Sequence, residues 1–218
     1  MKKIFKYKIP GLGFGVAFLA TGFFIKITSE LREKEFDLID GQILEWVKSF
    51  RLPVFNQWAI EITSLGSGSV LFLVAGVGVL IAISFKNYLA VLYLILVTTG
   101  AGVMTILLKN LFERDRPNIS SFLIDANGYS YPSGHSLGAA AVYFSVAIIC
   151  VAHIKNVKAR LALFISAGLL VGLVGLSRVY LGVHYFTDVL SGILLGIAWA
   201  FLLAASIKII EEKAGQKN

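Results

Sequence analysis

Charged residues are scarce in this chain: they make up 15% of its 218 residues, whereas 57% are hydrophobic. A soluble domain of this size needs a polar surface to cover its core, and so few charges do not provide one. A disordered chain would have more charge and fewer apolar residues, so that class is excluded as well. The composition therefore predicts an integral membrane protein.

Cysteine is nearly absent, and Cys150 is the one cysteine of the chain. It has no internal partner, which excludes an intrachain disulfide and a zinc site built from several cysteines. The net charge of +7 would suit a nucleic-acid partner, but the basic residues lie between apolar runs rather than in one patch. We therefore expect no nucleic-acid partner.

Apolar sequence is abundant, and it occurs in runs long enough to span a membrane. The runs are 9–27, 59–85, 88–108, 137–152, 161–176 and 189–210. They predict an all-α fold, a bundle of six transmembrane helices in a single domain, 1–218. Glycines at helical spacing, Gly168, Gly172 and Gly175 and then Gly192 and Gly196, favour closely packed helices. The first run is similar to a signal peptide, but it lacks a convincing cleavage site, so we expect an uncleaved anchor.

The distribution of charge predicts the orientation. With six spans both termini share a side, which carries 11 basic and 2 acidic residues, whereas the other side carries 9 basic and 11 acidic ones. Positive charge is retained in the cytoplasm, so both termini are expected there. The 11 basic residues are Lys2, Lys3, Lys6, Lys8, Lys86, Lys155, Lys158, Arg160, Lys208, Lys213 and Lys217.

The longest connection, 28–58, is then extracytoplasmic. Its apolar residues Phe36, Ile39, Ile43, Val47 and Phe50 recur at helical spacing among charges, which indicates an amphipathic helix. Such a helix lies in the membrane surface or packs on the bundle as a small extramembrane helix. The sequence favours neither alternative.

Three polar clusters, at 109–117, 132–135 and 177–188, interrupt the apolar pattern. Because of span parity, all three share one side, which is extracytoplasmic by the charge count. Three cations at a membrane boundary, Lys109, Arg116 and Arg178, require water or an anionic partner. A phosphate group suits them, although each one alone is typical of an ordinary interfacial cation.

The histidines of these clusters add chemistry to the cations. His184 and Asp188 are four residues apart at the expected start of the last helix, so the carboxylate can hold one imidazole nitrogen. A histidine held in this way is a competent nucleophile or base, although a structural hydrogen bond is the alternative for such a pair. Ser133 and Gly134 suit a helix N-terminus that binds an anion, or an ordinary cap with a glycine hinge.

Together the clusters resemble the signature of the type 2 phosphatidic acid phosphatase family, K-x6-R-P, P-S-G-H and S-R-x5-H-x3-D. All eleven specified positions match, in order and spacing, and residues 62–67 are similar to the membrane branch of the family. The matching positions are Lys109, Arg116, Pro117, Pro132, Ser133, Gly134, His135, Ser177, Arg178, His184 and Asp188.

The resemblance implies a two-step phosphoryl transfer without a metal or other cofactor. His184 would attack phosphorus and form a phosphohistidine, His135 would protonate the leaving oxygen, and Asp188 would orient His184. The substrate phosphate would be held by Lys109, Arg116, Ser133, Gly134 and Arg178. Asp115 and Asp125 in the same loop could suggest a metal, but the crowding of cations argues against one.

The resemblance also implies the substrate class. A site at the outer membrane boundary suits a lipid phosphate that enters the bundle laterally. Bacterial members of the family act on phosphatidylglycerol phosphate, undecaprenyl pyrophosphate, phosphatidic acid or lipid A phosphate, and this chain most resembles the phosphatidylglycerolphosphate phosphatases. The alternative is a non-catalytic lipid-phosphate transporter or sensor, which would not need the set of His184, His135 and Asp188.

Overall fold

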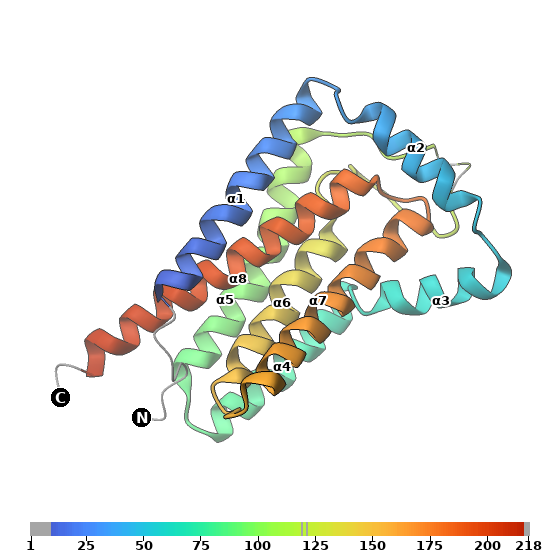
Figure 1. Ribbon diagram of the computed structural model, residues 1–218. Helices are drawn as coiled ribbons and strands as arrows, with labels where there is room; N and C mark the ends of the chain where they lie inside the picture. Colours follow the sequence, from blue (N-terminus) through green and yellow to red (C-terminus); the bar gives the residue numbers. More distant parts are fainter. Residues whose placement is uncertain (1–9, 119, 121, 216–218) are drawn as a thin grey trace.

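The computed structural model describes residues 10–118, 120 and 122–215, and these residues form eight α-helices and no β-strand (Figure 1). The predicted all-α fold is confirmed. The helices are α1 (Pro10–Arg32), α2 (Asp37–Lys48), α3 (Pro53–Ser64), α4 (Gly68–Ser84), α5 (Tyr88–Phe112), α6 (Gly134–Val151), α7 (Val157–Tyr180) and α8 (Phe186–Gly215).

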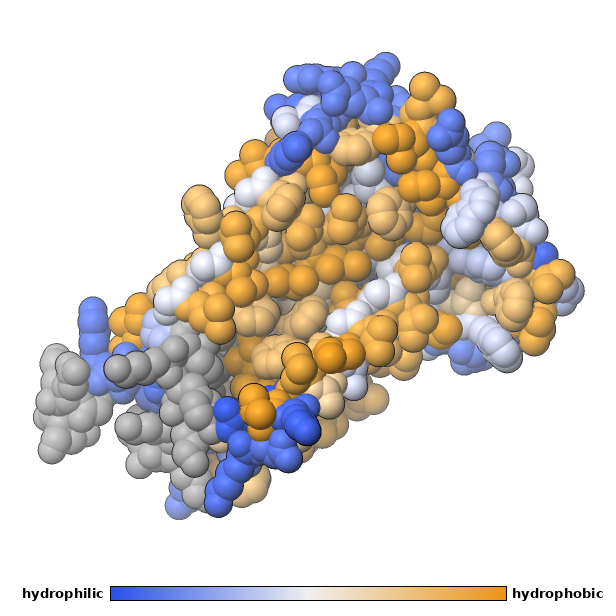
Figure 2. Space-filling model, in the orientation of Figure 1, coloured by the Kyte–Doolittle hydropathy of each residue, from blue (hydrophilic) through white to orange (hydrophobic). Residues whose placement is uncertain are grey.

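The long helices run side by side as a bundle, and α2 lies across one end of it (Figure 1). In the described part of the chain, α1, α5, α6, α7 and α8 are each long and apolar enough to cross a membrane, and α3 with α4 makes a sixth span if the bent pair is one. Figure 2 shows a broad apolar surface with hydrophilic residues gathered at the ends. This is the surface expected of a six-span membrane bundle.

The second span differs from the prediction of one continuous run at 59–85, because α3 and α4 meet at a bend of 45°. The bend has a local cause. Ser67 caps α4 by accepting a hydrogen bond from the backbone N–H of Val70, and Gly66 lies against α6 and α7. A Cβ atom on Gly66 would be 2.5 Å from Val174 and 3.2 Å from Cβ of His135. The bend therefore lets this corner approach the residues of the P-S-G-H cluster.

The predicted connection 28–58 is shorter in the structure, since α1 continues to Arg32 and α3 begins at Pro53. Between them, α2 packs against α7 and α8, with Leu44 in a buried cluster with Val179 and Val189. The helix packs on the bundle, and whether it also lies in the membrane surface stays a prediction. Its predicted apolar positions Ile39 and Phe50 stay exposed.

Helices α6 and α8 pack most closely, because glycines of α8 face the backbone of α6. A Cβ atom on Gly192 would lie 2.6 Å from the carbonyl oxygen of Ser133, and one on Gly196 would overlap the carbonyl oxygen of Leu137. The predicted close approach is confirmed for this pair. The prediction of close helix packing is wrong for Gly172, because no atom of another helix lies within 4 Å of the place where its Cβ would be.

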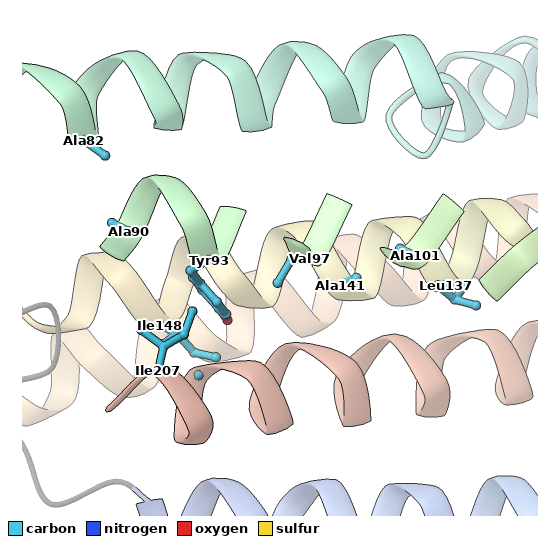
Figure 3. Packing of buried hydrophobic residues seen from close by; sticks show 10 residues of the cluster. Ala82, Ala90, Tyr93, Val97, Ala101, Leu137, Ala141, Ile148 and Ile207 are labelled. Carbon is cyan, nitrogen blue, oxygen red and sulfur yellow. The ribbon is translucent and has the colours of Figure 1, made fainter. Parts of the chain in front are cut away.

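The buried core is built from small and medium side chains of several helices (Figure 3). Tyr93 and Val97 of α5 lie fully buried beside Ile148 of α6 and Ile207 of α8. The phenol of Tyr93 donates a hydrogen bond of 3.0 Å to the carbonyl oxygen of Ala200, so its one polar atom is satisfied. The core therefore fixes the ends of α5, α6 and α8 relative to one another.

Candidate active site

The three polar clusters meet at the end of the bundle where α2 lies. Lys109 is in the last turn of α5, Arg178 is in the last turn of α7, and His135 is in the first turn of α6. His135 lies within range of coulombic interaction with Arg178, His184, Lys109 and Arg116. The convergence that span parity predicts is therefore present in the structure.

His184 is the best-held side chain of this group, and it is 2% exposed. Its Nδ1 lies 3.4 Å from Oδ2 of Asp188, which is completely buried. The same carboxylate oxygen accepts a hydrogen bond of 2.9 Å from the backbone N–H of Tyr185. Since α8 begins at Phe186, His184 precedes the helix, and the predicted pairing on one helical face is wrong in detail. Asp188 instead reaches back over the helix start, as in a capping box, and meets His184 there.

Ser130 joins these two side chains and has no place in the predicted set. Its hydroxyl donates a hydrogen bond to Oδ2 of Asp188, and its Oγ lies 3.2 Å from Nδ1 of His184. Because the hydroxyl hydrogen points to the carboxylate, Oγ is free to accept the Nδ1 hydrogen of His184. Ser130 and Asp188 thus hold the same nitrogen of the imidazole.

Arg116 faces the opposite nitrogen of His184. Its Nη1 lies 3.4 Å from Nε2 of His184 and donates to the carbonyl oxygen of Val183 at 2.7 Å. Its Nε and Nη2 donate to the carbonyl oxygens of Gly128 and Asn127 at 2.8 and 2.9 Å. A guanidinium is only a donor, so Nε2 is the acceptor and Nδ1 carries the hydrogen. The arrangement leaves the lone pair of Nε2 directed toward the cations.

Of the other two predicted cations, Lys109 is partly buried and Arg178 is buried, and Arg178 is only partly paired. Lys109 donates from Nζ to the carbonyl oxygen of Tyr129. Arg178, which is 5% exposed, donates from Nη1 to Oγ1 of Thr63 at 2.9 Å. Its Nε is buried and has no hydrogen-bond partner within the described ranges. A buried donor without a partner is rare in proteins and fits a ligand that supplies the acceptor.

Ser133 and Gly134 form the start of α6. Oγ of Ser133 accepts hydrogen bonds from the backbone N–H of Ser136, at 3.4 Å, and from its hydroxyl, at 2.9 Å. These bonds occupy the lone pairs of Ser133, so its hydroxyl hydrogen is left to donate to an anion. A Cβ atom on Gly134 would be 2.8 Å from Cγ2 of Thr105, so glycine is needed for helix packing here as well as for anion approach. Both predicted roles of these residues therefore fit the geometry.

An apolar groove leads from the surface of the bundle to His135. It has a volume of about 290 Å³ and lies between α4, α5 and α6. Small residues such as Gly102 and Gly138 make room for it, and Leu71 and Ile106 line it. A lipid chain in this groove would place its polar end beside His135.

The two carboxylates that could suggest a metal site do not come together in the structure. Asp115 and Asp125 line two separate cavities. Within the described ranges no three His, Cys, Asp or Glu side chains are grouped so that they could hold a metal ion. The residues that do converge are cationic donors, two histidines and the carboxylate of Asp188.

Several residues of the site escaped prediction from the sequence: Asp40, Thr63, Arg114, Ser130 and Thr187. Arg114 donates hydrogen bonds to the carboxylates of Asp40 and Asp188, and Thr63 accepts from Arg178. A signal existed for Asp40, because it lies three, four and seven residues before Ile43, Leu44 and Val47, on the apolar face of its helix. A charged residue on that face indicates a buried ion pair.

Burial lowers the pKa of His184 to about 4, although Asp188 beside it favours the charged form. The imidazole is then neutral, and able to act as a nucleophile, at any pH well above 4. As the pH is lowered from 6, we expect kcat/KM to stay constant at first and to fall only as the pH approaches about 4. The pH profile of kcat/KM is measured with two substrates whose phosphate groups differ in pKa. A fall in kcat/KM that occurs at the same pH with both substrates comes from the enzyme. An enzyme limb centred near 6.5 would contradict the buried, neutral state of His184.

Comparison with known proteins shows the family to which the chain is similar. The sequence model of the PAP2 superfamily matches residues 90–210. Phosphatidylglycerophosphatase B of Bacillus subtilis (strain 168) is 34% identical over 183 residues, which are 83% of this chain and 89% of that protein.

Two solved structures are also similar. The crystal structure of a transmembrane PAP2 type phosphatidylglycerolphosphate phosphatase from Bacillus subtilis has a TM-score of 0.80 and 33% identity, covering 90% of this chain and 96% of that one. LpxE of Aquifex aeolicus has a TM-score of 0.55 and 28% identity, covering 79% of this chain and 93% of that one.

Proposed function

The chain belongs to the PAP2 superfamily and is an integral membrane lipid phosphatase, and we propose that it transfers the phosphoryl group of its lipid to His184. The observation that carries this proposal is the position of His184. Its Nδ1 is held by Ser130 and Asp188, while its Nε2 faces Arg116 among the other cations. A transporter or sensor would not need a nitrogen prepared in this way.

In the first step, Nε2 of His184 bonds to phosphorus as the bond from phosphorus to the lipid oxygen breaks. His135 gives a proton to the departing oxygen. The imidazole of His184 becomes positively charged, and the carboxylate of Asp188 stabilises that charge. In the second step, water attacks the phosphohistidine, its proton passes to His135, and inorganic phosphate leaves.

The cations would hold the non-bridging phosphate oxygens during both steps. Arg178 offers its unpaired Nε, Arg116 offers Nη1, and Lys109 adds a mobile charge. Ser133 and the first amides of α6 add neutral donors from the helix start. These groups stabilise negative charge as it redistributes in the transition state.

The substrate we propose is a lipid phosphate that enters from the membrane. His135 lines the apolar groove between α4, α5 and α6, and it interacts with the cations, so a chain in the groove would bring a phosphate close to them. Phosphatidylglycerol phosphate is the first candidate, because the similar curated sequence and the similar crystal structure, both from Bacillus subtilis, carry that activity in their names. Phosphatidic acid and undecaprenyl pyrophosphate have the same chemistry at the reacting phosphate.

We expect purified protein to release phosphate from one or more of these lipids in the presence of EDTA, because the site supplies its positive charge from side chains. Vanadate is expected to inhibit, since it can take the place of the transferred phosphoryl group. The measurement is phosphate release from each lipid in mixed micelles, with and without chelator. Loss of release in EDTA that Mg²⁺ restores would contradict the mechanism.

We also propose that both termini are cytoplasmic and that the site faces outward. The support is the bias of 11 basic to 2 acidic residues around the termini. The connections α4–α5 and α6–α7 lie at the end of the bundle where α1 begins (Figure 1). Five of the residues counted lie outside the described residues: Lys2, Lys3, Lys6, Lys8 and Lys217.

Cysteine labelling tests this orientation in a Cys150→Ser background. With an impermeant maleimide, Asp125→Cys is expected to react in intact cells, and Lys155→Cys only after permeabilisation. Both positions are exposed, so accessibility depends on the side of the membrane. The reverse pattern would show that the orientation is wrong.

A further inference from the structure

Asp40 of α2 is completely buried, although it belongs to none of the three polar clusters. Its Oδ1 accepts a hydrogen bond of 3.0 Å from the backbone N–H of Thr187, and its Oδ2 accepts one from the hydroxyl of the same residue. Thr187 precedes Asp188 in the first turn of α8. A carboxylate of α2 is therefore fixed to the turn that carries Asp188.

Arg114 bridges the two buried carboxylates. Its Nη2 donates to Oδ2 of Asp40 at 2.8 Å, and its Nη1 donates to Oδ1 of Asp188 at 2.6 Å. The guanidinium lies over the ring of Tyr185, 4.3 Å from its centroid. Burial lowers the pKa of Arg114, but Asp188 and Asp40 raise it by more, so the side chain stays charged. The planar fork of an arginine donates to the two carboxylates from two nitrogens in fixed directions, whereas a lysine ammonium donates from a single nitrogen without that fixed geometry.

This Asp40–Arg114–Asp188 cluster has two consequences for His184. First, Arg114 holds Oδ1 of Asp188, which turns Oδ2 toward Nδ1 of His184. Second, two carboxylates and one guanidinium leave a net charge of −1 beside an imidazole that becomes positive when it bonds to phosphorus. Without Asp40 the cluster would be neutral and would stabilise that positive charge less.

We propose that Arg114 and Asp40 are positioning residues for phosphoryl transfer to His184, with Arg114 orienting Asp188 and Asp40 keeping the cluster negative. The proposal rests on the proposed function of His184 as nucleophile. Neither residue needs to touch the phosphate, so both should affect turnover more than substrate binding. Other ionisable groups that interact with His184 come from the α5–α6 connection, α6 and α7: Arg116, His135 and Arg178. Lys109 of α5 interacts with Arg116, Arg178 and Asp188.

Two substitutions separate charge from geometry. Asp40→Asn removes one negative charge and is expected to lower kcat about tenfold with KM little changed. It should also move the acidic limb of kcat/KM to lower pH by about half a unit, since the protonated imidazole loses a favourable charge. Arg114→Lys keeps the positive charge but removes the planar guanidinium that holds both carboxylates. We therefore expect kcat to fall while the acidic limb of the kcat/KM profile stays at the same pH.

Asp37→Asn is the matched control, because Asp37 is one turn earlier on α2, is exposed, and lies 3.9 Å from Arg114. It is expected to keep the wild-type kcat and pH profile. Rapid-quench measurement of phosphohistidine formation on each variant completes the test. Wild-type kcat in both test variants, or a fall in kcat of Asp40→Asn without a shift of its acidic limb, would overturn the proposal.

If Asp40→Asn elutes as an aggregate in detergent, the kinetics of Arg114→Lys alone test the proposed positioning role. A lower kcat with unchanged KM and acidic limb supports the positioning role, and a wild-type kcat overturns it. Failure of the proposed function gives a different result, because the wild-type enzyme itself would then form no phosphohistidine at His184.

Discussion

His184→Ala is expected to abolish formation of the phosphoenzyme and to lower turnover of every substrate by about 10⁴-fold or more, the loss typical of a missing catalytic nucleophile. The physical reason is that both contacts with Nδ1 prepare Nε2 of His184 as the nucleophile. Nδ1 of His184 is held by Ser130 and Asp188, so Nε2 alone presents a lone pair to the phosphate. The loss should be the same for good and poor leaving groups.

The measurement is turnover of an alkyl lipid phosphate and of an activated aryl phosphate by purified His184→Ala. His153→Ala is the control, since His153 lies at the opposite end of α6 and its ring contacts the carbonyl oxygen of Ile149. That control is expected to keep full activity, and a single peak on detergent gel filtration checks that both variants fold. Substantial turnover by His184→Ala would refute its role as nucleophile.

His135→Ala is expected to fail selectively. Without a proton donor, an alkyl lipid phosphate should react about 10² to 10⁴ times more slowly, because its leaving oxygen is strongly basic. An aryl phosphate needs no proton for departure, so its reaction should slow far less. His135 lines the apolar groove, so it would lie close to the bridging oxygen of a lipid phosphate bound there.

The same two substrates measure this effect, and the ratio of their rates is the informative quantity. The expected result is a ratio that changes strongly in His135→Ala, whereas in His184→Ala both rates fall together. If His135→Ala instead formed no phosphoenzyme while His184→Ala still did, the two roles would be reversed.

Those roles depend on contacts that the sequence predicts only in part. The gathering of Lys109, His135 and Arg178 at one end of the bundle was predictable, because it follows from the number of spans between them. The packing of Gly192 and Gly196 was predictable from their helical spacing. The first conclusion depends on the apolar runs and the second on helical spacing, and a sequence shows both directly.

The bend at Gly66 and the place of Ser130 were not predictable in the same way. The apolar run 59–85 contains the small residues Gly66, Ser67 and Gly68, but its mean hydropathy alone does not distinguish one helix from two. The bend depends on how Gly66 packs against Val174 and His135 of other helices. Ser130 depends on the path of the α5–α6 connection, which brings it to His184 from 54 residues away.

The pair of His184 and Asp188 lies between these cases. Their spacing predicts contact through one face of a helix, and contact is what the structure shows. The helix, however, begins at Phe186, after His184. Because Asp188 caps the helix start by binding the N–H of Tyr185, it can still reach the histidine. The contact was predictable, whereas its geometry depended on where the helix begins.

Localisation of the transferred phosphoryl group is the most direct test of the central claim. The enzyme would be quenched with alkali within milliseconds of mixing with labelled substrate, since phosphohistidine survives base and is lost in acid. Mass spectrometry of the peptides would then assign the modified residue. We expect the label on Nε2 of His184 in the wild-type enzyme and in His135→Ala, and none in His184→Ala. Label on His135 or on a serine, or turnover without any phosphoenzyme, would contradict the proposed mechanism.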